Sequence, residues 1–278
     1  MKLPKVFWLI AIPVAVLTLI VISLPSLLRL AGINPRYDGP THAVPGRRAL
    51  IVTTSHAVLG DTGKATGVYA SEMTVPYYTF LDGGMSVDVA SIGGGAIPVE
   101  PMSLRWPLLA PEDRRYLADP EFRRKTEHSL RIDEVDFASY DAVFLAGGWG
   151  ASYDLAQSEV LGKRITEANA AGAVLGSVCH GALGFLQART PQGDPLVKGR
   201  RMTAVTDKQV TELRITMTPL HPERELRAAG ALYEGSTAFR DMLASHVVVD
   251  GNLVTGQNQN DGAETARKMM EFIQKTGL

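Results

Sequence analysis

The chain has 278 residues, of which 45% are hydrophobic and 21% are charged, as in an ordinary folded globular protein. Its formal net charge of −1 provides no broad basic surface, so we do not expect nucleic acid as a partner. A single cysteine excludes an internal disulfide and any metal site built from several cysteines. This length allows one large domain or two small ones.

The first 30 residues predict a membrane anchor. Val6 to Leu28 contains no charged residue, and 23 helical residues at about 1.5 Å each can cross a hydrocarbon core of about 30 Å. The alternative is a cleaved signal peptide, but the apolar run is long for one and no small-residue cleavage site follows it. We therefore expect an uncleaved single-pass anchor in a lipid bilayer. Basic residues lie on both sides of the span, so the orientation stays open.

Residues 31–48 are rich in Gly, Pro and polar residues, which predicts a linker between the anchor and a domain of residues 49–278. In that domain, short apolar runs alternate with amphipathic segments. This order predicts an α/β fold with a mostly parallel sheet covered by helices on both faces. The predicted strands are 49–54, 85–92, 140–146, 173–178, 201–206 and 231–234, with a hairpin over 247–255. The predicted helices are 68–81, 155–171, 222–229 and 263–275.

The segment around Cys179 predicts a nucleophile. An apolar strand (173–178) runs into the only cysteine of the chain, which His180 and Gly181 follow before more apolar residues at helical spacing. Such a strand–turn–helix elbow lifts its central side chain over the N-terminus of the next helix, where a thiolate is favoured. The alternative is a buried free cysteine that acts only as a small hydrophobic residue. The elbow and the adjacent histidine favour a functional thiol.

Other chemically useful groups follow predicted strands, where open α/β sheets place their sites. Gly147, Gly148 and Trp149 follow one strand, and glycines there let backbone N–H groups approach a substrate oxygen, although a simple packing turn is the alternative. His180 needs an acidic partner if it acts as a base, and Asp207 and Glu212 are the candidates.

Glu72 lies within the predicted helix 68–81, among apolar neighbours. A carboxyl group in such surroundings has a raised pKa and can stay protonated, so that it can donate a hydrogen bond to a thiolate. The sequence alone favours the alternative, in which Glu72 is an ordinary exposed glutamate of a helix.

Five motifs resemble the DJ-1/PfpI superfamily, and most closely its Hsp31-like branch of glyoxalase III and deglycase-like proteins. They are TGVYASE (66–72), AGGWG (146–150), YDL (153–155), VCHG (178–181) and LVTGQN (253–258). The resemblance covers about residues 49–273. It implies a flavodoxin-like sandwich, the thiol of Cys179 at the elbow, and Glu72 as the protonated acid beside it. It also implies His180 as the base with Asp207, or else Glu212, as its acid, and oxyanion contacts from Gly148 and the elbow backbone.

The resemblance further implies a cofactor-free enzyme that acts on reactive aldehydes or 2-oxoaldehydes, and family members commonly form homodimers. The Hsp31-like branch usually has GGHG where this chain has Trp149, which removes a polar group near the pocket mouth and indicates a more apolar substrate. A membrane-tethered redox sensor or stress holdase, or an amidase or peptidase that uses the same thiol, are the alternatives. No metal is expected.

Overall fold

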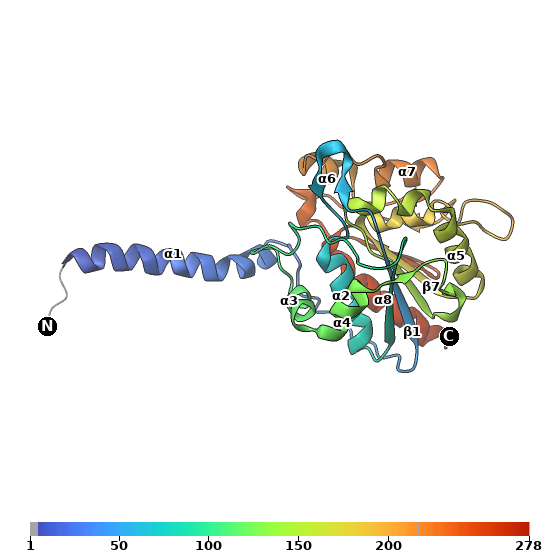
Figure 1. Ribbon diagram of the computed structural model, residues 1–278, viewed down its shortest axis with the longest axis horizontal. Helices are drawn as coiled ribbons and strands as arrows, with labels where there is room; N and C mark the ends of the chain where they lie inside the picture. The colour runs from blue at the N-terminus through green and yellow to red at the C-terminus, as the bar shows by residue number, and fades with distance from the viewer. Residues whose placement is uncertain (1–4, 216, 278) are drawn as a thin grey trace.

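The computed structural model describes residues 5–215 and 217–277, so the first four residues of the predicted anchor and Leu278 lie outside the described part. Helix α1 (Lys5–Leu30) projects from one side of a rounded α/β domain, and the C-terminus lies on the opposite side (Figure 1). Within α1, the most apolar 18-residue window of Phe7–Leu30 has a mean hydropathy of 2.7, and none of this window is buried against the protein.

A seven-stranded sheet forms the centre of the domain, in the order β10-β11-β7-β6-β1-β4-β5. All neighbouring pairs are parallel except β10 and β11, which form the hairpin predicted from the sequence. The strands are β1 (Arg48–Thr53), β4 (Ser86–Ser91), β5 (Leu130–Arg131), β6 (Ala142–Leu145), β7 (Val174–Val178), β10 (Val247–Asp250) and β11 (Leu253–Gly256). The resulting α/β sandwich confirms the predicted flavodoxin-like fold.

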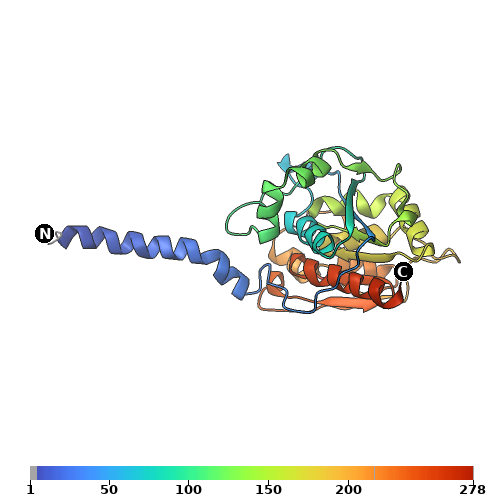
Figure 2. The same cartoon turned by 90° about the horizontal axis from the view of Figure 1, so that it is seen from below.

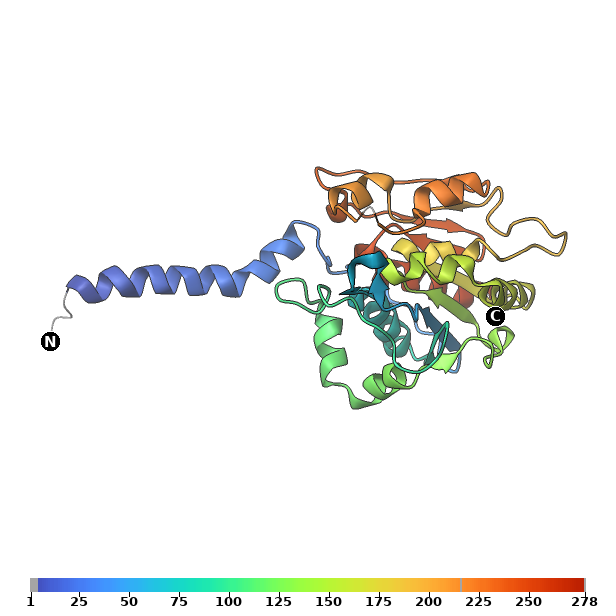
Figure 3. The same ribbon diagram turned by 45° about the horizontal axis from the view of Figure 1, so that its top comes forward.

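The two faces of the sheet bury separate apolar cores. Alternate residues of a strand point to opposite faces, so Ile51 of β1 packs in one core and Leu50 in the other. Helices α2 (Ala70–Asp82) and α8 (Gly262–Thr276) cover the first face side by side (Figure 2), whereas α5 (Glu159–Ala170) and α7 (Pro222–Ala228) cover the second (Figure 3). Helices α3 (Pro111–Ala118) and α4 (Pro120–Glu127) flank α2.

Most predicted elements are present, with three differences near the carboxyl ends of the strands. The predicted strand 201–206 is only the two residues of β8 (Arg201–Met202), paired with β9 (Leu232–Tyr233), because Thr206 already caps α6 (Asp207–Glu212). The segment after the elbow is a 3₁₀ helix, η5 (Cys179–Phe185), rather than an α-helix. A two-stranded hairpin, β2 (Val58–Leu59) with β3 (Lys64–Ala65), lies between β1 and α2, in a segment without a predicted strand.

The linker between α1 and β1 packs against the domain instead of hanging free. Ile33 and Val44 are buried, and the backbone N–H of Val44 donates to the carbonyl of Gly83 (2.8 Å). The side chain of Asn34 donates to the carbonyl of Leu108, and its backbone N–H donates to Asn260 Oδ1 (2.8 Å). The apolar helix therefore leaves the domain from a fixed point.

Candidate active site

Cys179 lies at the carboxyl end of β7 in a strained backbone conformation. Its φ is +56°, a region that residues other than glycine adopt rarely and that strand-to-helix elbows use to expose a nucleophile. The extended Val178 precedes it and η5 follows. The predicted elbow is therefore present, with Cys179 at its apex.

His180 directs its ring back to the thiol of its neighbour. The Cys179 Sγ and His180 Nδ1 atoms are 3.4 Å apart, which places the two side chains in hydrogen-bond contact. The imidazole is fully buried, and this desolvation lowers its pKa to about 3, with a smaller contribution from the charge of His221. His180 is therefore a neutral base in the resting site, and its Nε2 has no hydrogen-bond partner among the described residues.

Glu72 occupies the first turn of α2 and is 1% exposed, so it is not the ordinary surface glutamate that the sequence alone favoured. Burial raises its pKa to about 8, against opposing hydrogen bonds with the Cys179 thiol and the backbone of Gly147. At neutral pH the carboxyl group is therefore mostly protonated, as expected for an acid that donates a hydrogen bond to the sulfur.

The thiol of Cys179 is more buried and less acidic than the elbow alone predicts. Its exposed fraction is 6%, and its pKa is raised above the ordinary value by burial, by the charge of Glu72 and by their hydrogen bond. Hydrogen bonds from the backbone N–H groups of His180 and Gly148 act in the opposite direction. Because two buried acids in contact cannot both ionise cheaply, the pair carries at most one negative charge near neutral pH.

The Gly147–Gly148 turn brings the end of β6 against the elbow. A Cβ atom at Gly147 would meet Glu72 Oε2 and would lie 2.7 Å from the backbone nitrogen of His180, so only glycine fits there. Gly148 has a φ of +100°, which glycine tolerates. Trp149, at the start of η3 (Trp149–Ser152), is half-buried, and its ring meets the His180 ring at a centroid distance of 5.0 Å.

No hydrogen bond or ion pair joins His180 to either candidate acid among the described residues. Asp207 begins α6, where its carboxylate lies 3.6 Å from His221 Nδ1 and 4.0 Å from Arg224. Glu212, at the other end of α6, accepts a hydrogen bond from the backbone N–H of Asp241 (2.9 Å). Both acids lie in α6, which begins directly after its cap Thr206.

Two residues near the nucleophile were not among the predicted site residues. Tyr69 caps α2, and burial together with the charges of Glu72 and Cys179 raises the pKa of its phenol. It stands within the TGVYASE motif, which is the signal that could have found it. His221 lies at the start of α7, and nothing in its sequence context indicates its place near His180.

Comparison with known proteins agrees with this geometry. The sequence matches the DJ-1/PfpI family over residues 64–272. The chain belongs to the DJ-1/PfpI family. A member of this family, the glutathione-independent glyoxalase hsp3101 of Schizosaccharomyces pombe, is 27% identical over 246 residues that cover 84% of this chain and 100% of that protein. Glyoxalase 3 of Candida albicans is 27% identical and covers 80% of this chain and 95% of that protein.

Solved structures of family members superpose on nearly the whole domain. The crystal structure of glyoxalase III from Candida albicans has a TM-score of 0.73 at 26% identity, and covers 81% of this chain and 97% of that one. The rapid encystment protein of 24 kDa from Francisella tularensis has a TM-score of 0.76 at 27% identity, and covers 82% and 99%.

Proposed function

We propose that this protein is a glutathione-independent glyoxalase that converts 2-oxoaldehydes such as methylglyoxal to 2-hydroxy acids. The similarity to several glyoxalases supports the reaction class. The observation that carries the proposal is the contact of one thiol with a neutral imidazole and a protonated carboxyl group. The Cys179 thiol forms the hemithioacetal with the substrate in place of the thiol of glutathione.

In the proposed mechanism, Cys179 adds to the aldehyde carbon, and its proton passes through His180 to the aldehyde oxygen, which gives a hemithioacetal and leaves His180 neutral again. His180 then removes the proton from that carbon and returns it to the adjacent one, which leaves a thioester of the 2-hydroxy acid. Water hydrolyses the thioester, so the net reaction is addition of one water molecule, with no net oxidation and no cofactor. The N–H groups of Gly148 and His180 are suited to stabilise the oxyanions that form.

A different observation supports the proposed role of each site residue. Cys179, His180 and Glu72 are supported by their mutual contacts and burial. Gly147 is supported by the close fit of Glu72 and the elbow, and Trp149 by its contact with the His180 ring. Asp207, whose carboxylate lies 3.6 Å from His221 Nδ1, is proposed to act on His180 through that second histidine.

The similarity to several glutathione-independent glyoxalases favours an enzyme over the alternative of a redox sensor that uses the same thiol. A test of the proposal is D-lactate or L-lactate formation from methylglyoxal without glutathione, with the wild-type protein and Cys179→Ala. We expect the wild type to turn over and the variant to lose all activity. Activity that survives in Cys179→Ala, or a wild type that releases amines from amides but leaves methylglyoxal untouched, contradicts the proposal.

We also propose that α1 anchors the enzyme in a membrane, with residues 1–30 as the anchor, 31–48 as the linker and 49–278 as the catalytic domain. The length and hydropathy of Phe7–Leu30, and the absence of burial in its most apolar window, support this assignment. Extraction with detergent but not with alkaline carbonate would support it, whereas release by carbonate contradicts it. A homodimer stays a prediction from the family resemblance.

A further inference from the structure

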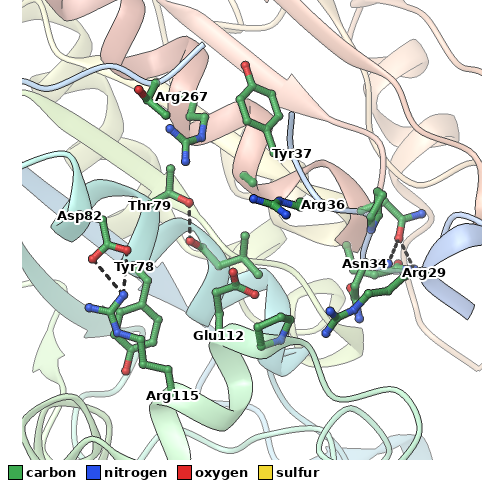
Figure 4. A pocket seen from close by; sticks show the side chains of 17 residues that line it. Arg29, Asn34, Arg36, Tyr37, Tyr78, Thr79, Asp82, Glu112, Arg115 and Arg267 are labelled. Carbon is green, nitrogen blue, oxygen red and sulfur yellow. Dashed lines mark hydrogen bonds and ion pairs between the residues drawn. The ribbon is translucent and has the colours of Figure 1, made fainter. Parts of the chain in front are cut away.

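A cavity of about 500 Å³ lies at the junction of α1 and the domain, away from the thiol (Figure 4). Its walls come from four segments: the end of α1 with the linker, the middle of α2, the start of α3, and the start of α8. The arginines and acids on its walls are Arg29, Arg36, Arg115, Arg267, Asp82 and Glu112. Four guanidinium groups against two carboxylates give the walls a net charge of +2.

The arginines differ in how far they are already neutralised. Arg115 Nη1 donates to both carboxylate oxygens of Asp82, at 2.8 and 2.9 Å. The charge of Arg115 is therefore already neutralised by Asp82. Arg36 has only a loose contact with Asp38 at 3.7 Å, where both side chains are exposed. Arg29 and Arg267 form no ion pair within the described ranges 5–215 and 217–277.

Arg267 carries the clearest sign of a missing partner. Its guanidinium carbon lies 5.0 Å from the centre of the Tyr37 ring, yet its buried Nε has no hydrogen-bond acceptor among the described residues. Figure 4 shows that Arg36 and Arg267 face the same space from two different segments. A buried N–H donor without a partner is costly, and an anionic oxygen in the cavity would supply its acceptor.

The position of the cavity indicates where such an anion comes from. Arg29 both ends the apolar run of α1 and lines the cavity, so the cavity lies at headgroup depth when α1 spans a bilayer. The segment before α3 lies on the side of the domain from which α1 leaves (Figures 2 and 3), and Asn34 of the linker donates a hydrogen bond to its Leu108 carbonyl. In this segment, the side chains of Met102 and Trp106 are about half exposed. Exposed tryptophan next to arginine is typical of a membrane interface.

We propose that this cavity binds the phosphate of an anionic phospholipid headgroup, held by Arg29, Arg36 and Arg267. Guanidinium groups suit phosphate because their forked N–H donors match its oxygens. Binding would fix the domain against the bilayer with one orientation. The inference rests on the proposed anchor but not on the proposed reaction.

The test uses the full chain in a neutral detergent and native mass spectrometry with phosphatidic acid, phosphatidylcholine or inorganic phosphate. We expect one saturable phosphatidic acid per chain, bound at least tenfold more tightly than phosphatidylcholine and not displaced by millimolar inorganic phosphate. The variant Arg36→Gln/Arg267→Gln should weaken this binding at least tenfold. The charge-matched control Arg114→Gln/Arg124→Gln changes two exposed arginines of α3 and α4 that do not line the cavity, and it should bind as the wild type does.

Three results overturn the inference. Equal weakening in both double variants shows diffuse charge attraction rather than a site. Binding of inorganic phosphate as tight as that of the lipid assigns the cavity to a soluble phosphate compound. No saturable binding of either removes the site altogether. Because the readout is lipid mass, and circular dichroism checks that both variants are folded, an absence of methylglyoxal turnover would refute the proposed reaction without affecting this result.

Discussion

The substitution Glu72→Gln tests whether a shared proton controls the nucleophile. Glutamine keeps the shape of the side chain but can never carry the charge that Glu72 gains at about pH 8. Below that pH, the carboxyl group of the wild type donates a stronger hydrogen bond to the thiolate than an amide does. A difference of about 1.4 kcal/mol, within the range for hydrogen bonds to charged groups, corresponds to a tenfold lower thiolate fraction in the variant.

Above pH 8 the sign of the effect reverses. Two unit charges about 4 Å apart repel by about 4 kcal/mol at an effective dielectric constant of about 20. Ionised Glu72 therefore raises the pKa of the Cys179 thiol. Glutamine removes this repulsion. We therefore expect Glu72→Gln to react more slowly than the wild type at pH 6.5 and faster at pH 9.5, with the two curves crossing near pH 8.

The rate of alkylation by iodoacetamide across this pH range measures the effect, and the chain has one cysteine, so all the label reports on Cys179. Glu212→Gln is the control, because its carboxylate binds the backbone of Asp241 and not the thiol. Two curves that differ by the same factor at every pH, or that coincide, would refute a shared proton between Glu72 and Cys179.

Three further predictions follow from the same contacts. Because folding raises the pKa of Glu72 from 4.5 to about 8, the folded state holds an extra proton between these values, so the free energy of unfolding falls as pH rises through that range. The free energy of unfolding, measured by urea denaturation at several pH values, should fall less with rising pH in Glu72→Gln than in the wild type. Asp207→Asn should change the kcat for methylglyoxal less than threefold, because the carboxylate contacts His221; a tenfold loss contradicts this reasoning. Trp149→Ala uncovers the His180 ring, so the pKa of His180 should rise from about 3, and the acidic limb of the kcat/KM profile should move to higher pH.

The sequence by itself determined the parts of this protein that depend on local pattern. An uncharged run of 23 residues predicts α1, alternating apolar segments predict the parallel sheet, and a strand that runs into Cys179 and His180 predicts the elbow. Each of these depends on neighbouring residues, because strand and helix periodicity and the geometry of a tight turn are set within about one element.

Only the tertiary structure decided which distant groups meet the thiol. Glu72 is more than a hundred positions from Cys179 in the sequence. In the fold, the side chain of Glu72 is buried against Gly147, and this burial raises its pKa. From the sequence, the role of Glu72 followed only from the family resemblance. Asp207 stands close to a predicted strand end, yet in the structure it begins α6 and its carboxylate lies 3.6 Å from His221 Nδ1. Contacts between side chains of different elements depend on where each helix begins and how the helices pack. The local sequence pattern does not determine the first residue of a helix closely enough to predict these contacts.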